Sequence, residues 1–422
     1  MRLFLALPLL FALLLPQQAM AQVAVADSGD TAWMILCGML VLMAAMPGLM
    51  LRHAGLVRAR NSLSVIVQGL VAAAGISLLW GIIGYSLAYA PGSSWLGGGA
   101  NILLANLGPL RDGLTVPESA FALFQMALAI LAACLLPGAV AERVKIGWMT
   151  VFALLWLLLV YTPVVHWVWG GGWLAHLGVM DFAGALVVHL CAGFSALALV
   201  LIVGKRRAVS SGHASVLGIA GGALLWVGWA GIVGGWAFGA TDEAATAILN
   251  AHFAACAGAC GWMLVERIDG GRLTATSPVS GALAGLVAIS ASAAVVGPGG
   301  AMAIGLIAAI LCRVGKALLG TRIDDPADVF LIHGIGGLTG MLLLIPFALT
   351  PLGGAGFAAG ISLGGALVAQ LIGIAAVAFW AMAGSAIIAL ILSVVVPPRI
   401  GAREEAEGLD LMQHGQQGWD FR

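Results

Sequence analysis

Two histidines occupy matching places in two apolar segments of the sequence. His189 follows Asp181 by eight residues, and His333 follows Asp325 by the same interval. The run 182–204 is long enough to span roughly 30 Å of hydrocarbon as a helix. An ionisable side chain is costly there and usually faces a path or a cavity. The repeated spacing therefore predicts a duplicated unit that brings the two histidines together near the middle of a membrane.

The composition indicates a polytopic membrane protein. Hydrophobic residues make up 62% of the chain and charged residues 9%, whereas about 25% of a typical soluble domain is charged. The 60 glycines among 422 residues indicate helices that approach one another closely. The sequence contains no phosphate loop, nucleophile elbow or metal-ligand cluster. We therefore expect no enzyme, no catalytic group, no metal, no cofactor and no nucleic-acid partner.

The six cysteines all lie in apolar stretches. Cys256 and Cys260 are four residues apart and could share a helix face, which is poor geometry for a disulfide framework or a zinc site. We therefore predict that all six are small buried hydrophobic residues.

Residues 1–21 have the pattern of a cleaved signal peptide, with Arg2 at the start, a short apolar core and a small-x-small site. Cleavage before Gln22 would leave the mature N-terminus in the periplasm. We expect residues 22–396 to form an all-α membrane domain and residues 397–422 to form a polar cytoplasmic tail. The eleven expected spans are 31–51, 62–89, 118–138, 147–165, 182–203, 215–237, 243–265, 279–297, 300–318, 329–349 and 362–396, the last being long and either tilted or broken.

The distribution of positive charge supports this topology. An external start and an odd number of spans place the C-terminus in the cytoplasm. Every Lys and Arg other than Arg2 and Arg111 then lies at or near the cytoplasmic side. Spans 1–5 and 6–10 form an inverted five-helix repeat, with span 11 outside it, which places both histidines near the midplane of the bilayer. We expect a multi-pass protein of the cell inner membrane.

Six motifs extend over essentially the whole mature chain. They are GYSLAYAPG at 84–92, PGAVAERVK at 137–145, HWVWGGGWLA at 166–175, DFAGALVVH at 181–189, DDPADVFLIHG at 324–334 and EGLDLMQHG at 407–415. With these motifs the sequence resembles the ammonium transporter family (Amt/MEP/Rh), most closely its bacterial Amt branch. The resemblance implies an eleven-helix fold with two pseudosymmetric halves, a homotrimer and one pore through each protomer.

The resemblance assigns roles to several residues. The paired pore histidines of the family map onto His189 and His333. Trp169 matches the aromatic residue of the outer vestibule, where a cation over an indole face gains about 0.5–2 kcal/mol. Asp181 matches the acidic residue below that site, and we expect it to cap the start of its span. Asp325 is its counterpart in the second half.

An apolar pore with two histidines suits ammonium for a physical reason. Ammonium and potassium have similar size and equal charge, so a site built from carbonyls or carboxylates would discriminate poorly. Hydrocarbon imposes tens of kcal/mol on a bare ion by idealised Born solvation. Ammonium can shed a proton and cross as neutral ammonia, and each imidazole can accept or donate a hydrogen bond to it. The resemblance also suggests that the histidines pass the released proton.

The sequence departs from the family at the mouth of the pore. The family usually has two stacked Phe rings there, and these positions fall on Leu128, four residues after Phe124, and on Ile232. A family Ser aligns with Trp236, which either forms a two-indole cage with Trp169 or plugs the vestibule. The aliphatic pair either gates less tightly than stacked rings or packs shut.

Ammonium transport is the leading hypothesis, and two alternatives stay open. One is a neutral-gas channel for ammonia or carbon dioxide, and the other is an ammonium sensor with little flux that signals through its tail. The tail motif implies a PII (GlnK-type) signalling protein as partner, although GQQGWDF at 415–421 replaces the usual ending. His252 could line the pore, but we favour a helix-packing contact for it.

Overall fold

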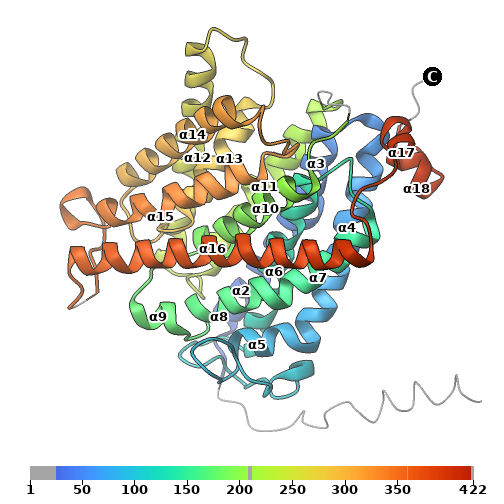
Figure 1. Ribbon diagram of the computed structural model, residues 1–422. Coiled ribbons are helices and arrows are strands. Elements are labelled where there is room, and N and C mark those ends of the chain that lie inside the picture. Colours follow the sequence, from blue (N-terminus) through green and yellow to red (C-terminus); the bar gives the residue numbers. More distant parts are fainter. Residues whose placement is uncertain (1–24, 208–211, 359, 420–422) are drawn as a thin grey trace, which may run out of the picture.

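The computed structural model describes residues 25–207, 212–358 and 360–419 (Figure 1). The regular structure in these residues is helical, and the only β-pairing among them is two isolated bridges. Ten helices in this part are long and apolar enough to cross a membrane, and the remaining expected span is the shorter helix α13. The expected all-α fold of about eleven spans is therefore confirmed. The predicted signal peptide at 1–21 lies outside the described residues.

The first half of the chain supplies spans that are interrupted by short π-helical turns. In chain order its main helices are α2 (Ser28–Met43), η1 (Ala44–Gly48), α3 (Leu49–Leu56), α4 (Ser62–Leu79), η3 (Trp80–Gly84), α5 (Tyr85–Tyr89), α6 (Glu118–Ala139), α7 (Ile146–Trp156), η5 (Leu157–Tyr161), α8 (Thr162–Val168), α9 (Trp173–Leu177), η6 (Ala185–Leu190) and α10 (Cys191–Val203).

The second half has longer uninterrupted helices and ends in two short ones. These helices are α11 (Ser215–Gly235), α12 (Asp242–Ile268), α13 (Ser277–Ile289), α14 (Pro298–Leu319), η7 (Phe330–Ile335), α15 (Gly336–Phe347), α16 (Leu363–Val395), α17 (Ala402–Glu407) and α18 (Leu409–His414). Single 3₁₀ turns occupy η2 (Ala59–Asn61), η4 (Ile102–Leu104) and η8 (Thr350–Leu352).

Glycine allows the helices to pack at short distance. A Cβ on Gly55 would lie 2.3 Å from the backbone nitrogen of Gly218, so α3 and α11 touch through their backbones. A Cβ on Gly258 would lie 2.4 Å from the carbonyl oxygen of Gly281, where α12 meets α13. Between helices in lipid, close packing of this kind replaces the hydrophobic driving force available in water.

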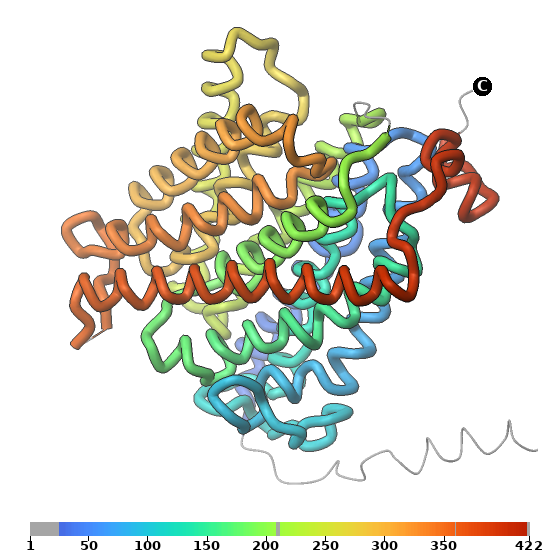
Figure 2. The backbone as a smooth tube through the Cα atoms, in the orientation of Figure 1, coloured from blue at the N-terminus to red at the C-terminus, as the bar shows by residue number. Residues whose placement is uncertain are grey.

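Helix α16 is one continuous helix of 33 residues and is not broken. It runs along the outside of the bundle (Figures 1 and 2). A helix of this length measures about 50 Å, well above the roughly 30 Å of hydrocarbon that a span must cross. Large apolar side chains on it, such as Phe379 and Val394, are exposed, as expected of a surface that faces lipid or another subunit.

Two sequence expectations are wrong in detail. The eighth span was expected at 279–297, but α13 ends at Ile289. The carbonyls of the next residues, Ser290 and Ala291, accept hydrogen bonds from the backbone N–H groups of 183 and 182 (2.7 and 3.0 Å). The backbone after α13 therefore binds the segment that leads into η6 instead of continuing the helix. Cys256 and Cys260 are exposed on α12, while the other four cysteines are buried. A residue in a membrane span stays in apolar surroundings when it faces lipid, so an apolar run does not imply burial.

The helix bundle has two polar faces, one at each end of its helices. The tail face carries the short loops after α3, α6, α10 and α14 together with α17 and α18, as Figure 1 shows. The opposite face carries the long segment 90–117 and the loop 169–184.

Candidate functional site

His189 and His333 meet inside the bundle. Their Nδ1 atoms are 3.2 Å apart and their ring centroids 5.1 Å apart. His189 is 0% exposed and His333 is 8% exposed. A neutral imidazole has one donor and one acceptor nitrogen, so one Nδ1 donates to the other in this contact. The two histidines that the repeated spacing singled out are therefore direct neighbours.

Each histidine sits on a π-helical turn that an aspartate caps. Two turns, η6 and η7, carry His189 and His333. The Asp181 carboxylate accepts the backbone N–H groups of 184, 186 and 187 at 3.2, 3.0 and 2.9 Å. The Asp325 carboxylate accepts the N–H of Phe330 at 2.8 Å. The eight-residue spacing thus joins a cap to the turn it satisfies, and π-helical turns of this kind are frequent at functional sites.

Two glycines bring the turns into contact. A Cβ on Gly193 would lie 2.3 Å from the backbone nitrogen of Gly334, the residue after His333. A Cβ on Gly337 would lie 2.7 Å from the carbonyl oxygen of Ala185, at the start of η6. No larger residue fits at either position without moving the backbone, so the contact between the two imidazoles depends on both glycines.

Trp229 on α11 supports His189, and sequence reasoning missed this role. The two rings stack with centroids 4.9 Å apart and an interplanar angle of 25°. The indole Nε1 donates to the Ser290 hydroxyl at 2.9 Å, which fixes the ring. The Nε2 atom of His189 has no partner in the protein and is thus free to bond a small polar molecule. The chain has 14 tryptophans, so no sequence signal separates this one.

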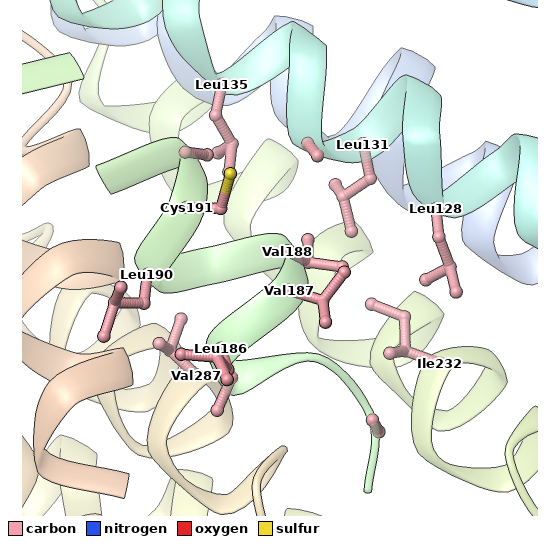
Figure 3. Close-up of a cluster of buried hydrophobic side chains, with 14 of the residues drawn as sticks. Leu128, Leu131, Leu135, Leu186, Val187, Val188, Leu190, Cys191, Ile232 and Val287 are labelled. Carbon is pink, nitrogen blue, oxygen red and sulfur yellow. The ribbon is translucent and has the colours of Figure 1, made fainter. Parts of the chain in front are cut away.

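The side of the histidines toward the opposite face is closed by aliphatic side chains. Leu128 on α6 and Ile232 on α11 converge with Leu131, Val187 and Val188 in Figure 3. Leu128 is 0% and Ile232 1% exposed. The two positions that replace stacked Phe rings are therefore packed shut in this conformation.

Beyond them the mouth is filled by aromatic rings. The centroids of Trp169 and Trp236 are 4.1 Å apart at an angle of 48°, which leaves no room for a cation between the two faces. Trp169 donates from Nε1 to the backbone carbonyl of Asp181 at 3.0 Å. Phe124 meets Trp236 edge to face at 6.1 Å and 74°. The two indoles thus pack directly against each other in this conformation.

On the tail side of His333 lie two further ionisable residues, Arg52 and His53 on α3. Both are buried, at 3% and 4% exposure. Together with His333, Trp229 and six aliphatic residues they line a small cavity of about 10 Å³. Sequence reasoning placed Arg52 only among the charges near the cytoplasmic side and gave His53 no role. The signal available was an adjacent Arg and His directly after an apolar run.

His252 does not belong to this path. It is exposed on α12, its ring centroid lies 5.5 Å from that of Trp226, and its Nε2 is 3.7 Å from the sulfur of Cys256. The packing contact that we favoured for it is present, and a pore-lining role is wrong.

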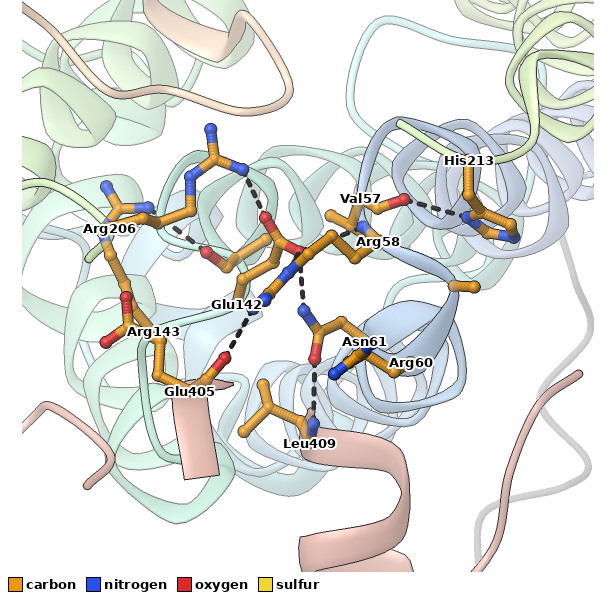
Figure 4. A network of polar contacts seen from close by, with 12 residues as sticks. Val57, Arg58, Arg60, Asn61, Glu142, Arg143, Arg206, His213, Glu405 and Leu409 are labelled. Carbon is orange, nitrogen blue, oxygen red and sulfur yellow. Dashed lines mark hydrogen bonds and ion pairs between the residues drawn. The ribbon is translucent and has the colours of Figure 1, made fainter. Parts of the chain in front are cut away.

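A buried carboxylate organises the tail face (Figure 4). Glu142 accepts the backbone N–H and the Nε of Arg58 at 3.0 and 2.9 Å and the amide of Asn61 at 2.6 Å, and it pairs with Arg206. Arg206 also pairs with Asp324 at 2.7 Å. Burial alone would raise the pKa of Glu142, but the Arg58 N–H and the Arg206 guanidinium together hold that pKa below its ordinary value.

The tail 397–419 docks on this network. Arg58 donates to the carbonyl of Glu405 at 2.7 Å, and Asn61 accepts the N–H of Leu409 at 2.8 Å. The Asp410 carboxylate accepts the N–H groups of residues 63 and 64 at 3.0 and 2.8 Å, which caps the start of α4. Glu405 pairs with Arg207 and Arg399. The tail is therefore a packed part of the protein over these residues.

The arrangement is suited to passing a small neutral molecule that forms hydrogen bonds. An apolar section leads to a histidine pair with an unpartnered ring nitrogen, and a cavity the size of one small molecule follows. Among the described residues no group of three or more His, Cys, Asp or Glu side chains could hold a metal ion.

Comparisons with known proteins identify the family and the fold. The model of the Ammonium Transporter Family matches residues 32–419. An ammonium transporter of Bacillus subtilis (strain 168) is 40% identical over 399 residues, which are 93% of this chain and 98% of that protein. The ammonium transporter Amt1 of Archaeoglobus fulgidus is 37% identical and covers 92% and 98%. The solved structure of a sensor Amt protein superposes with a TM-score of 0.86 at 29% identity, covering 92% of this chain and 98% of that one.

Proposed function

We propose, since this chain belongs to the ammonium transporter family, that it takes up ammonium or ammonia across a cell membrane through the paired-histidine path. The observation that carries the proposal is the contact of His189 with His333 at 3.2 Å, reached through a section of buried aliphatic side chains.

The steps follow from the residues along the path. An ammonium ion is attracted to the aromatic mouth at Trp169, whose indole face favours a cation. The aliphatic section around Leu128 and Ile232 rejects ions because they lose their hydration there. Ammonium therefore gives up a proton before this section, and neutral ammonia continues. The unpartnered Nε2 of His189 then offers it a hydrogen bond in otherwise apolar surroundings.

Transport through this path requires the mouth to open. The indoles of Trp169 and Trp236 must separate, and the contact between Leu128 and Ile232 must loosen.

The closed mouth favours a second candidate function. A sensor would bind ammonium at the aromatic site and conduct little, and one structure to which this chain is similar is a sensor Amt protein. The docked tail would then carry the signal. Binding of ammonium to protein that conducts neither ammonia nor charge would select this candidate.

Orientation and partners are parts of the same proposal. Most Lys and Arg of the described residues lie at the tail face, which supports the proposal that this face is cytoplasmic and that the protein sits in the inner membrane. The family resemblance implies a homotrimer, and the exposed apolar surface of α12 and α16 suits a bilayer or a second subunit. A PII (GlnK-type) protein is the proposed partner at the tail face, where α17 and α18 lie.

The test is ammonia permeability of liposomes carrying the purified protein, measured by stopped-flow with an internal pH dye. The protein should raise the permeability to ammonia and leave that to potassium unchanged. His189→Ala should lower the rise about tenfold or more, since a lost hydrogen-bond partner for a buried polar group costs about 1–3 kcal/mol. His252→Ala is the matched control, because that histidine lies off the path. Permeability equal to that of empty liposomes would refute transport of ammonia.

A further inference from the structure

The cavity behind the histidine pair contains a buried guanidinium that the steps above do not use. Arg52 is 3% exposed and lies within a membrane-spanning helix. Its Nη2 atom donates to the Ser280 hydroxyl at 2.8 Å, and its Nη1 atom is buried without a partner. A buried charge of this kind is costly and calls for a functional explanation.

No carboxylate forms an ion pair with Arg52 within the described residues. None of the ion pairs there includes it, and the acid groups that precede η7 are engaged elsewhere. Asp328 pairs with Lys316 at 2.5 Å, and Asp325 accepts the N–H of Phe330. Two of the helices that pack around the cavity, α11 and α13, carry no charged residue. Asp328 attracts the charge of Arg52 without contacting it and is itself paired with Lys316, so the guanidinium stays positive toward its neighbours in the cavity.

The cavity has the size of a single small molecule. About 10 Å³ is open there to molecules as large as water, which is close to the least volume that holds one water. Ammonia is of similar size and has a lone pair that can accept a hydrogen bond from Nη1 of Arg52. Ammonium has no lone pair, and a guanidinium has no acceptor to offer it.

We propose that Arg52 is a specificity-determining residue that lets neutral ammonia leave the histidine pair on the tail side while preventing positive charge from following it. The N–H bond of ammonium breaks before the aliphatic section, the electron pair stays on nitrogen, and the proton returns to water at the opposite face. Ammonia takes up a proton from water on the tail side. No net charge crosses in this cycle.

The physical reason is repulsion between like charges in a site with little water. A proton that travelled through His189 and His333 would create an imidazolium beside a fixed guanidinium, with His53 the next side chain in its way. At the effective permittivity of protein interiors, a second charge within several ångströms lowers the population of that state roughly tenfold to a hundredfold. A relay through the histidines therefore ends at Arg52. This inference rests on the proposed function for its substrate.

The test compares charge movement with ammonia permeability in the same proteoliposomes. Currents after ammonium jumps are recorded on a solid-supported membrane, and permeability is measured by stopped-flow. Arg52→Gln should raise the ammonium-evoked current about tenfold or more relative to wild type. Arg52→Lys keeps the charge and should leave the current at the wild-type level.

A second pair of variants covers the case in which Arg52→Gln does not fold. Ser280→Asp places a carboxylate beside the guanidinium that Ser280 now accepts from, so it should raise the current as Arg52→Gln does. Ser280→Asn has nearly the same shape without the charge and should not. Monodisperse elution in detergent shows which variants are folded.

The inference about Arg52 is judged by the ratio of the variant current to the wild-type current, independently of the ammonia permeability. Equal currents in wild type, Arg52→Gln and Ser280→Asp would overturn the inference. A raised current in Arg52→Gln and Ser280→Asp, but not in Arg52→Lys or Ser280→Asn, would support it. The proposed function is judged separately by the permeability of the wild type, so its failure would be visible as a flat stopped-flow trace.

Discussion

Replacing Gly193 by Ala tests whether the histidine contact depends on the close approach of α10 to the π-helical turn η7. The new Cβ would lie 2.3 Å from the nitrogen and 2.4 Å from the Cα of Gly334. Ordinary contacts of a Cβ begin at 3.4 Å, so the two backbones must separate by about 1 Å. The 3.2 Å contact between the Nδ1 atoms then exceeds hydrogen-bond range.

Two opposing terms set the effect of this variant on stability. Overpacking in a well-packed core costs about 1–3 kcal/mol. Alanine in the interior of a helix is favoured over glycine by about 1 kcal/mol. We therefore expect a net destabilisation of about 0–2 kcal/mol, so the protein folds. Function should suffer more, because a misplacement of about 1 Å can lower a rate about a hundredfold.

The assay is stopped-flow ammonia permeability per reconstituted protein, with thermal unfolding in detergent measured in parallel. Gly193→Ala should lose at least nine-tenths of the wild-type permeability, roughly a tenfold fall, with a small change in the unfolding temperature. Gly299→Ala is the matched control, since that glycine lies in helix α14 with nothing within 4 Å of an added Cβ. If Gly193→Ala conducts like wild type, the paired contact is not what carries ammonia and the reasoning is refuted.

Three further predictions concern the mouth and the tail. Trp236→Ala should raise ammonia permeability, because it removes the ring in contact with Trp169. Trp226→Ala, which lies away from the path, should leave the permeability unchanged. A fall in permeability in Trp236→Ala alone would instead show that Trp236 belongs to an ammonium site. Asp410→Ala removes the cap of α4 and should weaken tail docking by about 0.5–2 kcal/mol. The expected readout is faster proteolysis within 402–419. Cleavage at the wild-type rate would count against the docking role of Asp410. The pKa of Glu142 is lowered in the folded protein, so the stabilisation that ionised Glu142 provides is present above the ordinary pKa of 4.5 and is lost as the pH falls through the folded pKa. The difference in unfolding temperature between wild type and Glu142→Gln should therefore be constant from pH 7 to 5 and narrow below about pH 4.5. A difference at pH 3 as large as at pH 7 would contradict this assignment.

Much of the fold was readable from the sequence because a bilayer imposes length. Each span must carry a long apolar run, and the polar residues that break these runs mark the loops, so most spans were placed within a few residues. The histidine pair was also readable, since each Asp and His is joined through one capped turn and the turn has a fixed length. The same local logic located Asp181 and Asp325 as caps.

The sequence did not determine whether a residue on an apolar helix faces lipid or the interior of the bundle. Lipid is as apolar as the interior of the bundle, so an apolar helix gives no contrast between its two sides, and the exposure of Cys256, Cys260 and His252 was not predictable. The packing of Leu128 against Ile232 and of Trp169 against Trp236 joins helices that are distant in sequence.

Arg52 and His53 show the same division. The sequence by itself determined that this Arg and His follow an apolar run, and that order suits the end of a span at the membrane surface. Only the tertiary structure turned them inward, because the glycines of α3 and α11 bring the helices into backbone contact, and the ring of His53 lies directly against Gly138. A charge that looks like an anchor in the sequence thus becomes a buried group in the cavity beside His333.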